Sequence, residues 1–200
     1  MTKFQRAVKL FVWVLIRFFY RLRVEGCENL PKTGPAVLIP NHVSYLDAVI
    51  IAAHVNRPVK FAMYWKLYNA MRWIVAPLGA FPIASPRESR EVYDQAFATM
   101  HETLNAGGLV CIFPEGMLTE DGRMNKFRPG ILTILQKNPV PVIPIGLKNL
   151  WGSYFSKKKK GWLKLPGHFR ARVTMKVGQP VKTGATLEEM RERVGMLALL

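Results

Sequence analysis

The chain has 200 residues, half of them hydrophobic, which is enough for one well-packed domain, and no linker rich in Pro, Gly or Ser indicates a second. Its formal net charge of +16 is the stronger constraint, because it favours an anionic partner: nucleic acid, acidic lipid headgroups or a phosphorylated substrate. The two cysteines, Cys27 and Cys111, lie far apart, so the sequence predicts a reducing compartment, no disulfide framework and no structural zinc.

The first 24 residues combine basic and large apolar side chains. Their unbroken apolar run, Leu10 to Ile16, is far shorter than the roughly 20 residues that span a bilayer, and no small-residue cleavage site follows it. A basic helix rich in Trp, Phe and Tyr suits the plane of a membrane interface. We therefore predict a membrane-associating helix over residues 1–24 and one domain over residues 25–200. Packing of part of the helix on that domain, and a crossing helix with Arg17 reaching the headgroups, stay open as alternatives.

Beyond residue 34 the chain alternates between predicted strands and helices. Strands are expected at 36–39, 59–62, 81–83, 109–113, 142–147 and 173–177, and helices at 45–53, 87–105, 130–136 and from Thr186 onward. Glu189 completes a capping-box pattern with Thr186. The segment 65–78 is apolar on too many sides for an ordinary surface helix, so it is either core or a second membrane-facing element. This alternation predicts an α/β fold: a single domain with a mostly mixed or parallel sheet flanked by helices.

An imidazole and a carboxylate, His42 and Asp47, follow the first of these strands. The loop after a buried strand faces solvent on a rigid support, which is where α/β sheets expose chemistry. A carboxylate that accepts the imidazole Nδ1–H fixes the tautomer and leaves Nε2 free as a general base. Taken alone, the two residues could equally cap the next helix.

A second polar loop follows the strand at 109–113 and reads Phe-Pro-Glu-Gly at residues 113–116. Pro and Gly around one carboxylate make a shaped turn that can hold Glu115 at the edge of the sheet, and Gly116 lets another group approach the backbone closely. By itself this loop would be a plain turn with a solvated Glu.

Together, Asn-His-x4-Asp at residues 41–47, Phe-Pro-Glu-Gly at 113–116 and Val-Ile-Pro-Ile at 142–145 resemble the glycerolipid acyltransferase family, that is, lysophosphatidic acid and lysophospholipid acyltransferases. The resemblance extends over residues 36–147, with the motifs in the family's order. It implies transfer of a fatty acyl group from acyl-CoA or acyl carrier protein to the free hydroxyl of a lysophospholipid of the 1-acyl-sn-glycerol-3-phosphate type. It implies no cofactor and no metal.

The resemblance also implies roles for individual residues. His42 would be the general base on the acceptor hydroxyl and Asp47 would orient it, and the hydroxyl would attack the thioester directly, without a seryl intermediate at Ser44. Glu115 would bind and place the acceptor. Backbone N–H groups near Gly116 are candidates for holding the oxyanion.

Two positions depart from the family pattern. Leu118 and Ser85 stand where members acting on phosphatidic acid precursors usually carry arginines, which would clamp a phosphate in bidentate fashion. Arg87, Lys126 or Arg128 could replace them from nearby. The departure keeps a phosphodiester acceptor, such as a lysophosphatidylethanolamine, as an alternative to lysophosphatidic acid.

The expected partners are an anionic membrane surface, a lysophospholipid acceptor and an acyl thioester donor, with peripheral or monotopic attachment at the cytoplasmic face of the cell membrane. The rival class is a basic nucleic-acid-binding protein, since Trp151 and the run Lys157–Lys160 could stack bases and contact phosphates. That hypothesis does not account for the apolar N-terminal helix or for the two loops, so we expect no nucleic acid. A membrane-surface binder without catalysis would keep the helix and have no need of His42. The oligomeric state stays open.

Overall fold

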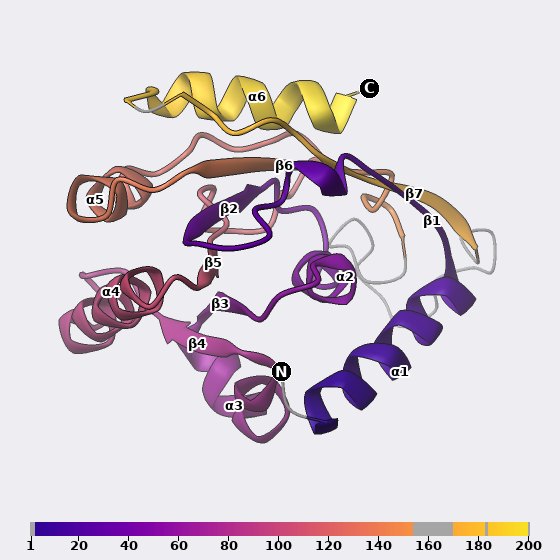
Figure 1. The fold of residues 1–200 in the computed structure, drawn as a ribbon, viewed down its shortest axis with the longest axis horizontal. Coiled ribbons are helices and arrows are strands. Elements are labelled where there is room, and N and C mark those ends of the chain that lie inside the picture. The colour runs from indigo at the N-terminus through magenta and orange to yellow at the C-terminus, as the bar shows by residue number, and fades with distance from the viewer. Residues whose placement is uncertain (1–2, 154–169, 183, 200) are drawn as a thin grey trace.

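The computed structural model describes residues 3–153, 170–182 and 184–199, in which helices alternate with the strands of one sheet (Figure 1). The strands are β1 (Tyr20–Glu25), β2 (Ala36–Pro40), β3 (Val59–Tyr64), β4 (Ala80–Ile83), β5 (Leu109–Cys111), β6 (Val142–Lys148) and β7 (Ala171–Val177). The helices are α1 (Lys3–Phe19), α2 (Asp47–His54), α3 (Trp65–Val75), α4 (Arg90–Asn105), α5 (Gly130–Lys137) and α6 (Leu187–Leu199), with short 3-10 turns η1 (Cys27–Asn29) and η2 (Ala76–Leu78). The run Lys157–Lys160 lies outside the described residues.

The strand order is β1-β7-β6-β2-β5-β3-β4, and all neighbours are parallel except the antiparallel pair β6–β7. The predicted single α/β domain with a mostly parallel, mixed sheet is therefore confirmed. In such sheets ligands bind outside the carboxyl ends of the strands. Because β2 and β5 are direct neighbours, the loops that carry His42 and Glu115 meet at one edge.

Helices cover both faces of the sheet and enclose one apolar cluster on each (Figure 1). On one face α1 and α2 pack with residues such as Ile16, Ile50 and Leu38. On the other, α4, α5 and α6 pack with residues such as Met100 and Ile134. All five residues of β2 are buried, because a central parallel strand is covered on both sides. That is why its sequence is a continuous apolar run.

The N-terminal helix is shorter than predicted. It ends at Phe19, and residues 20–25, expected to be helical to residue 24, form β1 beside β7. Tyr20 is buried and Leu22 is partly buried against the sheet, whereas Arg21 is exposed. This alternation has the period of a half-buried strand. The aromatic and basic run before it conceals the change of period, so the prediction was wrong there.

The segment 65–78, expected to be core or a second membrane-facing element, forms α3 and η2, and none of their residues is buried. Trp73 and Ile74 are 84% and 64% exposed, so the core alternative was wrong. Figure 1 shows α3 and α1 at the same end of the molecule. None of the described helices combines the length and the apolar composition that a bilayer-spanning helix requires.

The last helix begins with the predicted capping box. The N–H of Glu189 donates to Thr186 Oγ1 at 3.2 Å, and the N–H of Thr186 donates to Glu189 Oε2 at 2.7 Å. α6 then lies directly over β6, since a Cβ placed at Gly146 would be only 2.4 Å from the Leu197 backbone. The C-terminal helix therefore covers the middle of the sheet rather than its β1 edge.

Candidate active site

His42, in the loop after β2, is hydrogen-bonded to Asp47, the first residue of α2. Nδ1 of His42 and Oδ2 of Asp47 are 2.9 Å apart. The same oxygen accepts the backbone N–H groups of Val43, at 2.7 Å, and Ser44, at 2.9 Å. Three donors on one oxygen fix the carboxylate, and a negative charge at the start of a helix also suits the helix dipole. Asp47 thus fixes both the conformation of this loop and the orientation of the His42 ring.

This contact determines what the imidazole can do. An ionised carboxylate only accepts hydrogen bonds, so the proton of the neutral ring lies on Nδ1 and Nε2 carries the lone pair. Phe113 stacks on the ring with the centroids 4.0 Å apart. Asp47 is fully buried, whereas the His42 side chain is 23% exposed. The pair has the geometry of an oriented general base that a reactant can reach.

Burial raises the pKa of Asp47 above its ordinary value, against the opposing effect of its hydrogen bond and charge interaction with His42. Its second oxygen, Oδ1, is buried without a hydrogen-bond partner among the described residues. A buried, incompletely paired negative charge is costly. When the ring acts as a base, the proton that it takes up from a reactant lies next to this carboxylate and offsets its charge.

Glu115 faces the protein interior and is 2% exposed. Its Oε1 accepts the backbone N–H of His42 at 2.7 Å, and its Oε2 accepts the backbone and side-chain N–H groups of Asn125 at 2.7 and 3.0 Å. The N–H of Thr119 donates to the His42 carbonyl at 3.0 Å. Burial raises the pKa of Glu115, and the hydrogen bonds partly oppose that shift. Glu115 therefore holds the His42 loop in place, and direct binding of an acceptor by this residue stays a prediction.

Gly116 makes room for Arg128. It has φ +70°, and a Cβ there would lie 2.7 Å from Nε of Arg128. The N–H of Gly116 donates to the Phe113 carbonyl at 3.0 Å, so this particular amide is already engaged and is not a free donor for an oxyanion. The backbone N–H of Arg128 donates to the Pro114 carbonyl at 2.8 Å, which fixes the backbone of Arg128 beside the loop.

A cavity of about 1490 Å³ opens beside His42, between α2, β3, α3 and the two loops. Its walls are mainly apolar, as a site for a fatty acyl chain requires. Basic side chains on its wall include Lys60, Lys66 and Arg128. Arg57 also lines it, but its guanidinium donates to the carbonyls of three loop residues, Pro31, Gly34 and Gly107.

The structure brings some of the predicted site residues to this cavity and not others. His42, Gly116 and Arg128 line it, and Glu115 lies behind it. Arg87 and Lys126 are exposed but do not contribute to its lining. Their role in binding the acceptor stays a prediction.

Two lysines in the cavity wall were missed by sequence reasoning. Lys60 interrupts the apolar strand β3, and Lys66 lies in the first turn of α3. For Lys60, the sequence signal that could have indicated this position is a charged residue inside an otherwise apolar strand. Leu118 and Ser85, where arginines are expected, also line the cavity, so neither position supplies a charge to it.

An imidazole held by a buried carboxylate at the carboxyl edge of an α/β sheet, beside a large, mainly apolar cavity, suits acid–base chemistry on a lipid-like substrate. A family model described as Acyltransferase matches residues 21–148, and the chain belongs to this family. The resemblance drawn from the motifs is confirmed.

Individual relatives agree with this membership. The chain is 32% identical over 144 residues to a chloroplastic 1-acyl-sn-glycerol-3-phosphate acyltransferase of Arabidopsis thaliana, covering 70% of this chain and 39% of the relative. It is 31% identical to the 1-acyl-sn-glycerol-3-phosphate acyltransferase of Pseudomonas aeruginosa, covering 74% and 55%. The chain thus spans about two fifths to just over half of the length of these relatives.

The fold is also that of a solved structure. The 1-acyl-sn-glycerophosphate acyltransferase PlsC of Thermotoga maritima superposes with a TM-score of 0.74 at 22% identity, covering 96% of this chain and 76% of that one. At this level of identity the likeness establishes the shared architecture.

Proposed function

We propose that the protein transfers a fatty acyl group from a thioester, acyl-CoA or acyl carrier protein, to the free hydroxyl of a lysophospholipid. The observation that carries the proposal is the 2.9 Å contact between His42 and Asp47 on the wall of an apolar cavity. The names of the relatives support an acceptor of the 1-acyl-sn-glycerol-3-phosphate type.

In this reaction Nε2 of His42 takes the proton of the acceptor hydroxyl while its oxygen attacks the thioester carbonyl. The new C–O bond forms, the C–S bond then breaks, and the departing thiolate receives the proton from the imidazolium. The charge of Asp47 stabilises that imidazolium and keeps Nε2 directed at the reactants. Glu115 contributes by fixing the backbone of His42.

The direct test is His42→Ala, assayed with a labelled acyl-CoA and 1-acyl-sn-glycerol-3-phosphate. Loss of a general base is expected to lower kcat by roughly 10²- to 10⁴-fold without a large change in unfolding temperature, since the side chain is partly exposed. His54→Ala is the matched control, because His54 ends the adjacent helix and does not line the cavity. Near-normal turnover by His42→Ala would show that the base is misassigned.

The exposed apolar side chains support membrane attachment through α1 and α3. Phe11 and Phe18 of α1 are 63% and 57% exposed, and Trp73 of α3 is 84% exposed. The guanidinium of Arg17 lies 5.0 Å from the ring centre of Trp13. Exposed aromatic and apolar groups beside cations suit the plane of an anionic interface. We propose peripheral or monotopic attachment at the cytoplasmic face, where anionic lipids gather.

One observation favours a second acceptor class. Leu118 is only 7% exposed and fills with an apolar side chain a position where an arginine would clamp a phosphate. A phosphodiester headgroup carries one charge fewer than a phosphate monoester and has less need of that clamp. A lysophosphatidylethanolamine therefore stands as the alternative acceptor.

A further inference from the structure

Arginines gather on one face of the β1–β7 edge of the sheet. In the parallel register of these strands Arg21 lies opposite Arg172, and Arg23 lies opposite Thr174. Alternate residues of a strand point to the same face. Arg21, Arg23 and Arg172 therefore project together, away from the apolar cluster that holds Val173 on the other face. We call these three side chains the arginine ladder.

None of the residues that the structure describes covers the ladder. α6 lies over β6, where Gly146 permits its close approach to Leu197. Figure 1 shows the β1–β7 edge extending beyond this helix. All three side chains of the ladder are exposed.

The ladder arginines also form few ion pairs with acidic residues within the described part of the chain. Glu25 is the only acid in the sequences of β1 and β7, and it pairs with Arg23 and, at 3.4 Å, with Lys176. Among the described residues no acid forms an ion pair with Arg21 or Arg172. Like charges directly opposite each other on neighbouring strands destabilise a sheet. The ladder therefore weakens the isolated fold, and an anion lying on it would remove that cost.

The ladder is joined to the apolar helix without a linker. α1 ends at Phe19 and β1 begins at Tyr20. Ile16 and Tyr20 are buried, so the end of α1 is tied to the sheet, whereas Phe18 between them is exposed. The spacing between the exposed apolar side chains of α1 and the guanidinium groups of β1 is thereby fixed by the core.

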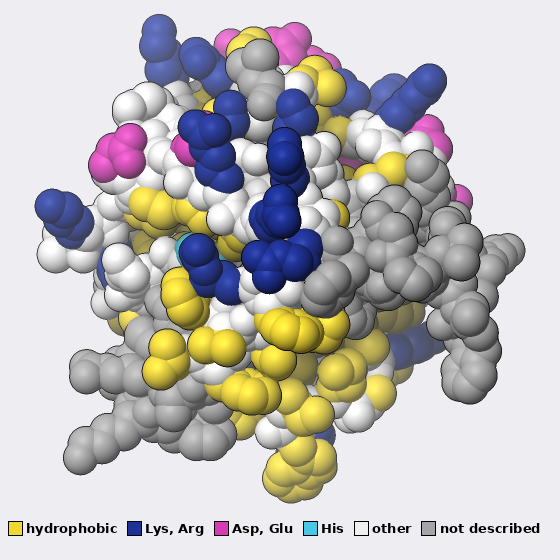
Figure 2. Space-filling model, turned by 90° about the vertical axis from the view of Figure 1, so that its right-hand side faces the viewer, with side chains coloured by type: hydrophobic (Ala, Val, Ile, Leu, Met, Phe, Trp, Pro, Cys, Tyr) yellow, Lys and Arg dark blue, Asp and Glu magenta, His cyan; other side chains and the backbone are white. Residues whose placement is uncertain are grey.

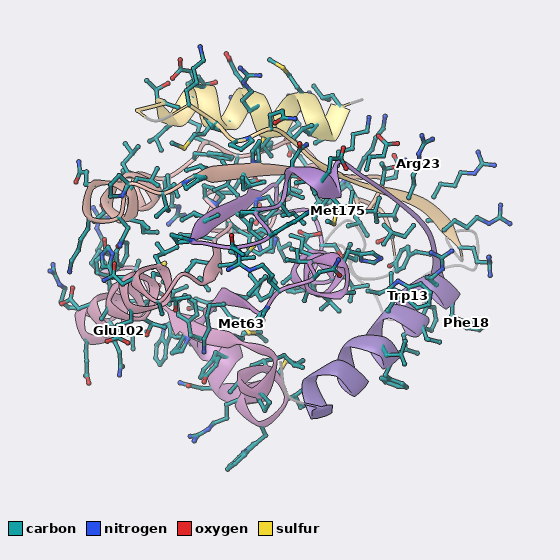
Figure 3. The ribbon with its side chains drawn as sticks, in the orientation of Figure 1. Trp13, Phe18, Arg23, Met63, Glu102 and Met175 are labelled. Atoms are coloured by element: carbon teal, nitrogen blue, oxygen red, sulfur yellow. The ribbon has the colours of Figure 1, made fainter. Side chains whose placement is uncertain are left out.

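The ladder projects from the sheet face opposite α1, but at the sheet edge both kinds of side chain are exposed on the same side of the molecule. Figure 3 places Trp13, Phe18 and Arg23 at the same side. Figure 2 views that side directly and shows a column of Lys and Arg side chains above a patch of apolar ones. Such a face matches a surface that presents phosphate groups next to hydrocarbon.

We propose that this face lies on an anionic phospholipid bilayer, with the arginine ladder on the lipid phosphates and the exposed side chains of α1 at the acyl boundary. The inference rests on the membrane attachment proposed above and adds which surface meets the lipid. Guanidinium groups bind phosphate in bidentate geometry, which makes arginine well suited to headgroups. A nucleic acid would match the charge but has no counterpart for the apolar helix.

The test is co-sedimentation of the purified chain with vesicles of phosphatidylcholine containing phosphatidylglycerol. Each basic residue near an anionic surface strengthens binding roughly fivefold, so Arg21→Gln with Arg172→Gln is expected to weaken it by at least about tenfold. Lys137→Gln with Lys182→Gln removes the same charge from exposed positions outside β1 and β7 and is expected to weaken binding much less. The difference should shrink in high salt, because exposed charges are screened.

Thermal unfolding of the same variants separates a binding role from a structural one. The glutamine pair is expected to unfold at an unchanged or higher temperature, because it relieves the repulsion between Arg21 and Arg172. The pair Arg21→Lys with Arg172→Lys retains the charge and is expected to retain most of the vesicle binding. Lower thermal stability of the glutamine pair, or loss of binding in the lysine pair, would overturn the proposal.

The remaining outcomes distinguish this inference from the attachment on which it rests. If the wild-type chain does not bind the vesicles, both fail. If it binds and the glutamine pair binds equally well, attachment stands and the ladder is not its site. If the glutamine pair loses binding to duplex DNA while keeping vesicle binding, the ladder is a nucleic-acid surface instead. Because no readout uses turnover, failure of the acyl-transfer proposal is separate from all of these.

Discussion

One carboxylate oxygen of Asp47 holds both the loop after β2 and the imidazole ring of His42, while the other oxygen has no hydrogen-bond partner among the described residues. The raised pKa of Asp47 shows that folding disfavours its ionised form. The stability linked to the protonated form is therefore present below the pKa of the unfolded chain and is lost as the pH rises through the higher pKa of the folded protein. At neutral pH the ionised side chain lowers the free energy of unfolding.

This leads to a prediction for Asp47→Asn. A neutral amide removes the buried charge, so the unfolding temperature at neutral pH is expected to stay the same or rise. Activity is expected to fall by at least roughly 10²-fold, because the imidazolium loses its counter-charge and the ring loses its fixed tautomer. Calorimetry and thioester-cleavage rates on the same preparation measure both. A marked loss of stability would mean that the charge of Asp47 serves the fold rather than the reaction.

At the scale of elements, α3 is the helix whose burial differs most from that of an ordinary surface helix. It begins where β3 ends, lines the cavity through Lys66 and Leu67, and leaves Trp73 and Ile74 in solvent. A helix that is apolar on several sides and has no buried residue gains little from its own domain. Under the membrane attachment proposed above, its exposed side chains would contact hydrocarbon, and the cavity would lie close to the lipid that supplies its substrate.

We therefore expect Trp73→Ser with Ile74→Ser to weaken vesicle binding by about tenfold or more, because full burial of one such side chain is worth about 1.5–3 kcal/mol. The unfolding temperature should change little, since both side chains are already exposed. Met196→Ser with Leu199→Ser on α6 is the matched control, with 54% and 81% exposed apolar side chains on another helix. Equal losses in the two pairs would contradict a specific role for α3.

At the scale of the whole molecule, the cavity is assembled from elements that the chain order keeps apart. Its wall combines the loops after β2 and β5 with β3 and α3, and only their positions in the sheet decide which basic side chains reach it. Of the three replacements predicted for the missing arginines, Arg128 is the one that lines the cavity. We therefore expect the choice of acceptor headgroup to depend on the tertiary arrangement of these side chains more than on any one sequence motif.

A panel of lysolipids with one labelled acyl-CoA is expected to show use of 1-acyl-sn-glycerol-3-phosphate. Arg128→Gln is expected to raise the KM for this acceptor by about tenfold or more, since a charge-assisted hydrogen bond contributes about 1.5–3 kcal/mol. Arg87→Gln and Lys126→Gln are expected to have smaller effects, because neither side chain lines the cavity. A preference for lysophosphatidylethanolamine with no response to Arg128→Gln would assign the phosphodiester alternative.

The sequence by itself determined the features that short-range geometry controls. The strand and helix periods, the capping box at Thr186, and the contact between His42 and Asp47 depend on residues a few positions apart, whose spacing the backbone sets. The apolar and basic character of the N-terminus is likewise local. Packing over long sequence separations cannot be derived from such patterns, because each strand has several partners of similar apolar character.

Only the tertiary structure decided the contacts between residues that are distant in sequence. It turned Glu115 inward to hold the backbone of His42, 73 residues away, because β2 and β5 are neighbours in the sheet. It converted residues 20–25 into an edge strand, because β7 offers them a parallel partner, and it brought Arg21 opposite Arg172 in doing so. The spacing of neighbouring residues therefore predicts the chemistry of the proposed site. The proposed membrane-contacting surface and the cavity wall form where strands that are distant in sequence become neighbours in the sheet.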